Sequence, residues 1–115
     1  MEKVALFVFN GDPMCFIHVL LNALEMAAKG KKVQIVIEGA STKLLPDLAR
    51  KENPLHSLWG KVKEKELVAG VCKACSNKTG TLESAKDQNL ALLDEMQGHP
   101  SIAKYQDEGY VVITF

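Results

Sequence analysis

Two of the chain's three cysteines stand at C-x-x-C spacing in the stretch GVCKACSNKTG, residues 70–80. This spacing permits a reversible disulfide, a metal site or a single sulfur-carrying thiolate. A further interpretation is that both cysteines are small buried side chains that take part in no reaction. The preceding apolar run, residues 67–72, predicts a strand that ends at the first cysteine, and a short helix should follow up to Gly80. The pair therefore lies where a strand gives way to a helix.

Cys75 is the better candidate for a reactive thiol. Cys72 ends the predicted strand, so its side chain should point along or into the sheet, whereas Cys75 lies in the first helical turn. Unpaired amide groups at a helix N-terminus stabilise a thiolate, and Lys73 and Lys78 add positive charge nearby. We expect Cys75 to react first, with Cys72 as the second catalytic candidate.

Zinc is an alternative use of the same thiols, because two cysteines need only two more ligands. Cys15 and His99 are the candidates, since both follow predicted strands at the same edge of the sheet. The spacing of the set Cys15, Cys72, Cys75 and His99 matches no zinc finger or ribbon. The main interpretation therefore has no metal.

Apolar runs of strand length recur along the chain. Residues 3–10, 33–37, 67–72 and 110–115 read as buried strands, while residues 90–96 fit either a strand or a continued helix. Helices are expected between these runs, with Asp12 and Ser101 as N-caps and Gly30 after the end of the first helix. This alternation predicts an α/β fold of three layers, an open, mostly parallel sheet of four or five strands with helices on both faces.

The ends of the strands locate further candidate residues. Ligands of such sheets bind outside the carboxyl ends of the strands. There the sequence places Asn10, the small turn of Gly39 and Ser41, the cysteine loop, and His99 in a turn. We expect Asn10, Gly39, Ser41 and His99 to take part in binding.

The composition excludes several classes of function. The 115 residues predict a single domain, 1–115, and fourteen basic residues balance fourteen acidic ones, so we expect no nucleic-acid partner. No run approaches the roughly 20 apolar residues of a membrane span and no signal peptide is visible, so we expect a cytoplasmic protein without membrane contact. Neither a G-x-G-x-x-G nor a Walker A pattern is present, and we expect no cofactor.

Four stretches together resemble the DsrE/DsrF-like family. They are KVALFVFNGDP, KVQIVIEG, VCKACSNKTG and GHPSIAKYQDEGYVVITF, which extend over nearly the whole chain. The resemblance implies a small cytoplasmic α/β protein that forms a homo-oligomer, often a trimer or hexamer. It also implies a place in sulfur relay, in which a cysteine after the third strand receives sulfane sulfur as a persulfide from a donor protein and passes it to an acceptor protein.

By position, the resemblance implies that Cys75 or Cys72 carries the sulfur. Relay members usually have one critical cysteine at this place, whereas this chain has two. The pair therefore leaves dithiol cycling and metal binding open beside sulfur transfer. Many members have no assigned activity, so the alternative to a catalyst is a non-catalytic oligomer that binds a small ligand or a metal.

Overall fold

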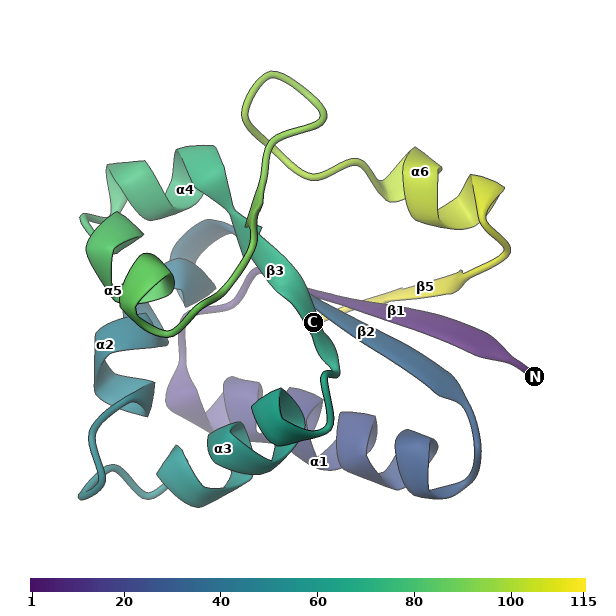
Figure 1. The fold of residues 1–115 in the computed structure, drawn as a ribbon, viewed down its shortest axis with the longest axis horizontal. Helices are drawn as coiled ribbons and strands as arrows, with labels where there is room; N and C mark the ends of the chain where they lie inside the picture. The colour runs from purple at the N-terminus through teal and green to yellow at the C-terminus, as the bar shows by residue number, and fades with distance from the viewer.

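A computed structural model describes all residues, 1–115, and contains one five-stranded sheet (Figure 1). All four strand pairings are parallel, and the strand order is β4-β3-β2-β1-β5. The strands are β1 (Lys3–Val8), β2 (Lys32–Ile37), β3 (Val68–Cys72), β4 (Leu92–Leu93) and β5 (Val111–Thr114). The predicted open parallel sheet is confirmed, and the ambiguous run 90–96 contains a strand.

Helices cover both faces of the sheet. In Figure 1, α1 (Pro13–Ala28) and α3 (His56–Glu64) lie below the sheet and α6 (Ile102–Asp107) lies above it. The remaining helices are η1 (Gly39–Leu44), α2 (Leu45–Leu48), α4 (Lys73–Lys78) and α5 (Leu82–Asp87). The three-layer arrangement follows the prediction, and none of the helices is long and apolar enough to span a bilayer.

The ends of α1 are set by local chemistry that the sequence predicts. The side chain of Asp12 accepts a hydrogen bond from the amide of Met14 at 2.8 Å, and Pro13 occupies the first helical position. Gly30 follows the helix with φ +86°, a left-handed conformation that glycine adopts without strain. Ser101 caps α6 in the same way, through the amide of Lys104.

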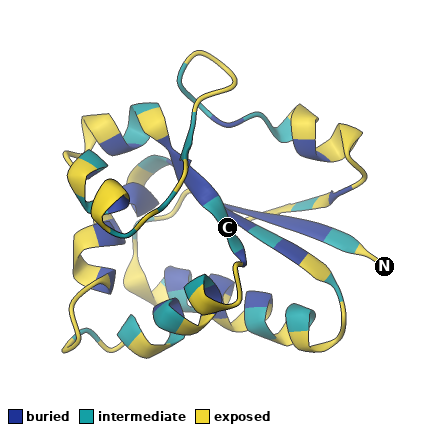
Figure 2. Cartoon of the chain, in the orientation of Figure 1, coloured by how far each residue is buried: buried dark blue, intermediate teal, exposed yellow.

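The larger of two hydrophobic clusters lies on the α1 face of the sheet. It contains 19 buried residues, most of them on α1, α3 and the strands; Figure 2 colours these, like all other buried residues, dark blue. Trp59 of α3 is fully buried and packs against Phe16 of α1, with ring centroids 6.1 Å apart. The chain's only tryptophan is therefore a core residue.

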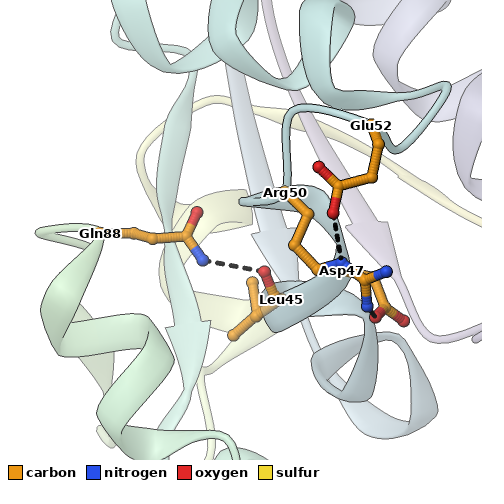
Figure 3. A network of polar contacts seen from close by, with 5 residues as sticks. All are labelled: Leu45, Asp47, Arg50, Glu52 and Gln88. Carbon is orange, nitrogen blue, oxygen red and sulfur yellow. Dashed lines mark hydrogen bonds and ion pairs between the residues drawn. The ribbon is translucent and has the colours of Figure 1, made fainter.

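A half-buried glutamine, Gln88 at the C-terminal end of α5, joins that helix to this larger core. The side-chain amide of Gln88 donates to the carbonyl of Leu45 at 2.9 Å, as Figure 3 shows. Its oxygen accepts a hydrogen bond from the indole of Trp59 at 2.8 Å. The same view contains the ion pairs of Arg50 with Asp47 and Glu52, whose side chains are more than half exposed. The tryptophan thus enters the core without losing its hydrogen bond.

The smaller cluster lies on the α6 face. It consists of five buried residues, namely Ala5, Phe7, Val36, Tyr105 and Tyr110. Tyr105 meets both Phe7 and Tyr110 edge to face, with ring centroids 5.4 Å apart in each pair. A single short helix therefore covers this face, with Tyr105 as its only aromatic side chain.

One sequence-based expectation about burial is wrong. Residues 110–115 do form a strand, but β5 is at the edge of the sheet and pairs only with β1. Val111 is 53% exposed and Ile113 is 38% exposed. Their register opposite Val4 and Leu6 places them on the α1 face, beyond the area that α1 covers. An apolar run predicts a strand, but it does not predict whether that strand lies at the centre or at the edge of the sheet.

Candidate functional site

Four side chains converge at the carboxyl edge of the sheet, and we call them the thiol cluster. They are Glu38, Cys72, Cys75 and His99. One potential ligand atom from each lies within 4.8 Å of those of the other three. Glu38 directly follows β2, Cys72 ends β3, Cys75 lies in α4, and His99 comes from the loop between β4 and α6. Parallel strands bring these four segments to one edge.

Cys72 forms the buried floor of the thiol cluster. Its side chain is fully buried, and its Sγ lies 3.2 Å from Nδ1 of His99 and 3.7 Å from the carbonyl oxygen of Gly98, to which the thiol donates. Burial is the largest cause that raises the pKa of Cys72, to about 12; the side chains of Cys75 and Glu38 act in the same direction, and the backbone amide of Cys75 acts against them. Near neutral pH, Cys72 is therefore a thiol.

Cys75 is the accessible thiol of the pair. Its side chain is half-buried, and its Sγ lies 3.8 Å from Nδ1 of His99. The backbone amide of Cys75 donates to the sulfur of Cys72 at 3.3 Å, so Cys72 is the N-cap of α4. This differs from the expectation that helix amides would face Cys75, because the chain enters α4 directly from β3 and brings the first turn over Cys72.

His99 is held by its own loop. Met96 and His99 exchange two backbone hydrogen bonds, of 2.7 and 3.0 Å, and the carbonyl of Gly98 accepts from the amide of Ala74 at 2.9 Å. Gly98 has φ +89°, and an added Cβ would lie 3.2 Å from that of Ala74. Glycine is needed at this point because the loop turns sharply against α4. In Figure 1 this loop arches beside the junction of β3 and α4.

Glu38 is the member of the cluster that sequence reasoning missed. A glutamate after a strand is usually solvated, but Glu38 is only 7% exposed. Burial raises its pKa to about 7, and the charge of Glu95 adds to the effect. The available signal was its position at the carboxyl end of β2, the strand beside β3, in the same turn as the proposed binding residues Gly39 and Ser41.

A cavity of about 270 Å³ opens beside Glu38. Its lining is largely apolar and includes Phe9, Met96, Pro100 and Ile102. The cavity lies against the loop that carries His99 and gives a small ligand or a partner's side chain room next to the thiol cluster.

The four predicted binding residues have different places in the structure. His99 belongs to the thiol cluster, and Gly39 follows Glu38 directly. The hydroxyl of Ser41 is buried and donates to the carbonyls of Val8 and Glu38, so it anchors the turn. The side chain of Asn10 accepts from the amide of Asp12 at 2.8 Å, and Asn10 lines a separate cavity together with Cys15.

Cys15 lies apart from the thiol cluster. It lines a separate cavity of about 490 Å³ with Asn10, His18, Asn22 and Phe115, between α1 and the end of β5. Cys15 belongs to α1, which follows β1, and β1 is two strand spacings, or about 10 Å, from β3. Of the four zinc ligands considered from sequence, the structure brings together three, and Glu38 stands where Cys15 was expected.

A model of the DsrE/DsrF-like family matches residues 3–115. This chain belongs to that family. A relative from Methanocaldococcus jannaschii, an uncharacterised protein, is 37% identical over 117 residues, covering 96% of this chain and 93% of the relative. A second uncharacterised protein, from Archaeoglobus fulgidus, is 39% identical over 41 residues, covering 36% of this chain and 67% of that protein.

A solved structure has the same DsrE-like fold. A conserved protein of unknown function from Bacteroides thetaiotaomicron superposes with a TM-score of 0.71 over 99% of this chain and 95% of that protein, at 14% identity. The DsrE/DsrF-like family is associated with sulfur relay. In this DsrE-like chain, His99 and Glu38 surround the two thiols that follow the third strand.

Proposed function

We propose that this DsrE-like protein carries sulfane sulfur as a persulfide on Cys75. The observation that carries the proposal is the pairing of a half-buried Cys75 with Nδ1 of His99, 3.8 Å from its sulfur, above a fully buried Cys72. A sulfur carrier needs one thiol that a partner can reach and one group that can take its proton. Cys75 and His99 meet these two needs.

Sulfur acceptance needs one proton transfer and one exchange at sulfur. With the imidazole protonated at Nε2, Nδ1 of His99 accepts the proton of the Cys75 thiol. The thiolate attacks the outer sulfur of a donor persulfide, and the bond between the two donor sulfurs breaks as the new S–S bond forms. The donor leaves as a thiolate and takes up the proton. The sulfane sulfur keeps its oxidation state, so the step needs no oxidant or reductant.

Delivery repeats the exchange in the opposite direction. An acceptor thiolate attacks the outer sulfur of the Cys75 persulfide, and Cys75 is released as a thiolate. The buried Cys72 is poorly suited to attack, because it lies beneath the helix turn and is a thiol near neutral pH. We assign Cys72 a positioning role, in which its sulfur accepts the amide of Cys75. The cavity beside Glu38 supplies room for the donor or acceptor side chain.

We also propose that the protein works in the cytoplasm as a homotrimer or homohexamer with separate donor and acceptor proteins. Family membership and the exposed Val111 and Ile113 on the edge strand support self-association. Light scattering of the purified protein measures this assembly, and a monomer at micromolar concentration would contradict it.

The test of the sulfur-carrier proposal is mass spectrometry after treatment with limiting inorganic polysulfide. We expect one adduct of about 32 Da, the mass of one sulfur atom, on the peptide that contains Cys75. Cys75→Ser should abolish the adduct and His99→Gln should slow its formation. Cys15→Ser is the matched control, because Cys15 is also a half-buried free thiol beside a histidine, His18.

The Cys15→Ser protein should load as the wild-type protein does. Equal loading of Cys15 and Cys75 in the wild-type protein would contradict the proposal, since reactivity would then follow exposure alone. An adduct that persists in Cys75→Ser and moves to Cys72 would contradict the assignment of the carrier.

A further inference from the structure

We propose that the thiol cluster is also a binding site for Zn²⁺, with Glu38, Cys72, Cys75 and His99 as its four ligands. The proposal goes beyond sulfur transfer, because it rests on the arrangement of four donor atoms and not on any reaction of Cys75. The four residues come from four different segments of the chain, so only the folded protein assembles the site.

The distances between the donor atoms fit a tetrahedral ion. With Zn–S of about 2.3 Å and Zn–N of about 2.0–2.1 Å, a sulfur and a nitrogen on one tetrahedron lie about 3.6 Å apart. Nδ1 of His99 lies 3.2 Å from Sγ of Cys72 and 3.8 Å from Sγ of Cys75, on either side of this value. All four donor atoms lie within 4.8 Å of one another. Small rotations of side chains would complete the coordination shell.

The donor types select the ion. Two sulfurs and one imidazole suit zinc, whereas magnesium and calcium prefer sites made entirely of oxygen. The carboxylate of Glu38 supplies a fourth ligand, and the structure gives no other close ion-pair partner to this buried side chain. Binding releases the two thiol protons to solvent as the sulfurs become thiolate ligands.

The residues around the site orient its ligands and leave one side open for a metal ion to enter. The amide of Cys75 donates to the sulfur of Cys72, and the turn at Gly98 fixes His99 against α4. Outer contacts of this kind orient metal ligands in proteins. Glu38 and Cys72 are buried, while Cys75 and His99 are half-buried, so an ion enters from the side that a sulfur donor would also approach. Zinc and sulfur therefore compete for Cys75.

The test is a titration of chelator-treated full-length protein with Zn²⁺ against a chromophoric competitor, with Co²⁺ as a spectroscopic probe. We expect one equivalent of Zn²⁺ per chain, and thiolate-to-cobalt charge-transfer bands with Co²⁺. Cys75→Ser should weaken binding by about 100-fold or more, and Glu38→Gln by at least about tenfold. Cys15→Ser is the matched control and should leave the affinity unchanged.

Two separate measurements distinguish this proposal from the sulfur-carrier proposal. Zinc affinity is measured without any sulfur donor, and saturating Zn²⁺ should block the adduct on Cys75 of the wild-type protein. The zinc proposal is overturned by an absence of stoichiometric binding, by an affinity that Cys75→Ser leaves intact, or by binding that disappears in Cys15→Ser. None of these results depends on whether the protein transfers sulfur.

Discussion

The two faces of the parallel sheet carry cores of very different size. On the α1 face, 19 buried residues form one cluster that includes Trp59 and Phe16. On the α6 face, five buried residues lie under a helix of six residues. Burial of apolar surface is the dominant favourable term in folding, so the α1 face supplies most of the stability.

The thiol cluster is on the thinner side. Side chains alternate along a strand, and Val71 points into the larger cluster, so Cys72 points to the α6 face. Leu93, which pairs with Cys72, packs against the smaller cluster. The fold therefore separates its tasks: one face holds the sheet together, and the other carries the reactive groups on strand ends and on a loop.

The largest expected effect is the loss of Trp59 from the thicker face. Trp59→Ala removes a fully buried ring and leaves Gln88 without its indole donor. We expect the free energy of unfolding to fall by about 3–5 kcal/mol. Ile102→Ala, at a half-buried position against the smaller cluster, should cost about 1 kcal/mol. Urea unfolding followed by far-ultraviolet circular dichroism measures both, and a reversed ranking would refute the comparison of the two faces.

A smaller effect on stability is expected at Gly70, in the part of β3 that packs against β4 near the thiol cluster. An added Cβ at Gly70 of β3 would lie 2.6 Å from the carbonyl oxygen of Ala91 and 2.8 Å from Cγ of Leu93. Gly70→Ala should therefore push β4 away and cost about 1–3 kcal/mol. Because β4 leads into the loop of His99, the variant should also bind Zn²⁺ more weakly than the wild-type protein.

Gly60 provides the matched control for this substitution. It lies inside α3, and an added Cβ would meet no other atom within 4 Å. Gly60→Ala should raise the free energy of unfolding by about 0.5–1 kcal/mol and leave zinc affinity unchanged. Equal stability of the Gly70→Ala and Gly60→Ala proteins would show that β4 is not held closely against β3.

The sequence predicts the elements of both faces well, because local patterns encode them. The caps at Asp12 and Ser101, the stop at Gly30 and the apolar runs all correspond to structure. The meeting of His99 with the cysteines also follows, from the rule that parallel strands bring their carboxyl ends to one edge.

Strand order is what local patterns do not encode. The distance of β1 from β3, two strands away, keeps Cys15 of the following helix out of the thiol cluster, and the edge position of β5 exposes Val111. Likewise, only the pairing of β2 with β3 brings Glu38 to Cys72. Residues on neighbouring strand ends can be grouped from sequence once the order of the strands is known.

The smallest expected effect is a change in stability at alkaline pH, which arises from Tyr105 on the α6 face. Burial is the largest cause that raises the pKa of Tyr105 to about 12, and the charges of Glu95 and Glu108 add to it. The folded state therefore favours the neutral phenol more than the unfolded state does. This contribution to stability is fully present below the ordinary tyrosine pKa of about 10 and is lost as the pH rises through about 12.

Tyr105→Phe removes a phenol that resists ionisation in the folded protein. Relative to the wild-type protein, the variant should show a constant difference in unfolding free energy below pH 10 and should gain about 1–2 kcal/mol between pH 10 and 12. Urea titrations at several pH values measure this difference, and ultraviolet absorbance of the phenolate reports the ionisation directly. A difference that stays constant up to pH 12 would mean that water reaches Tyr105 freely and that α6 covers the sheet more loosely than its packing against Phe7 implies.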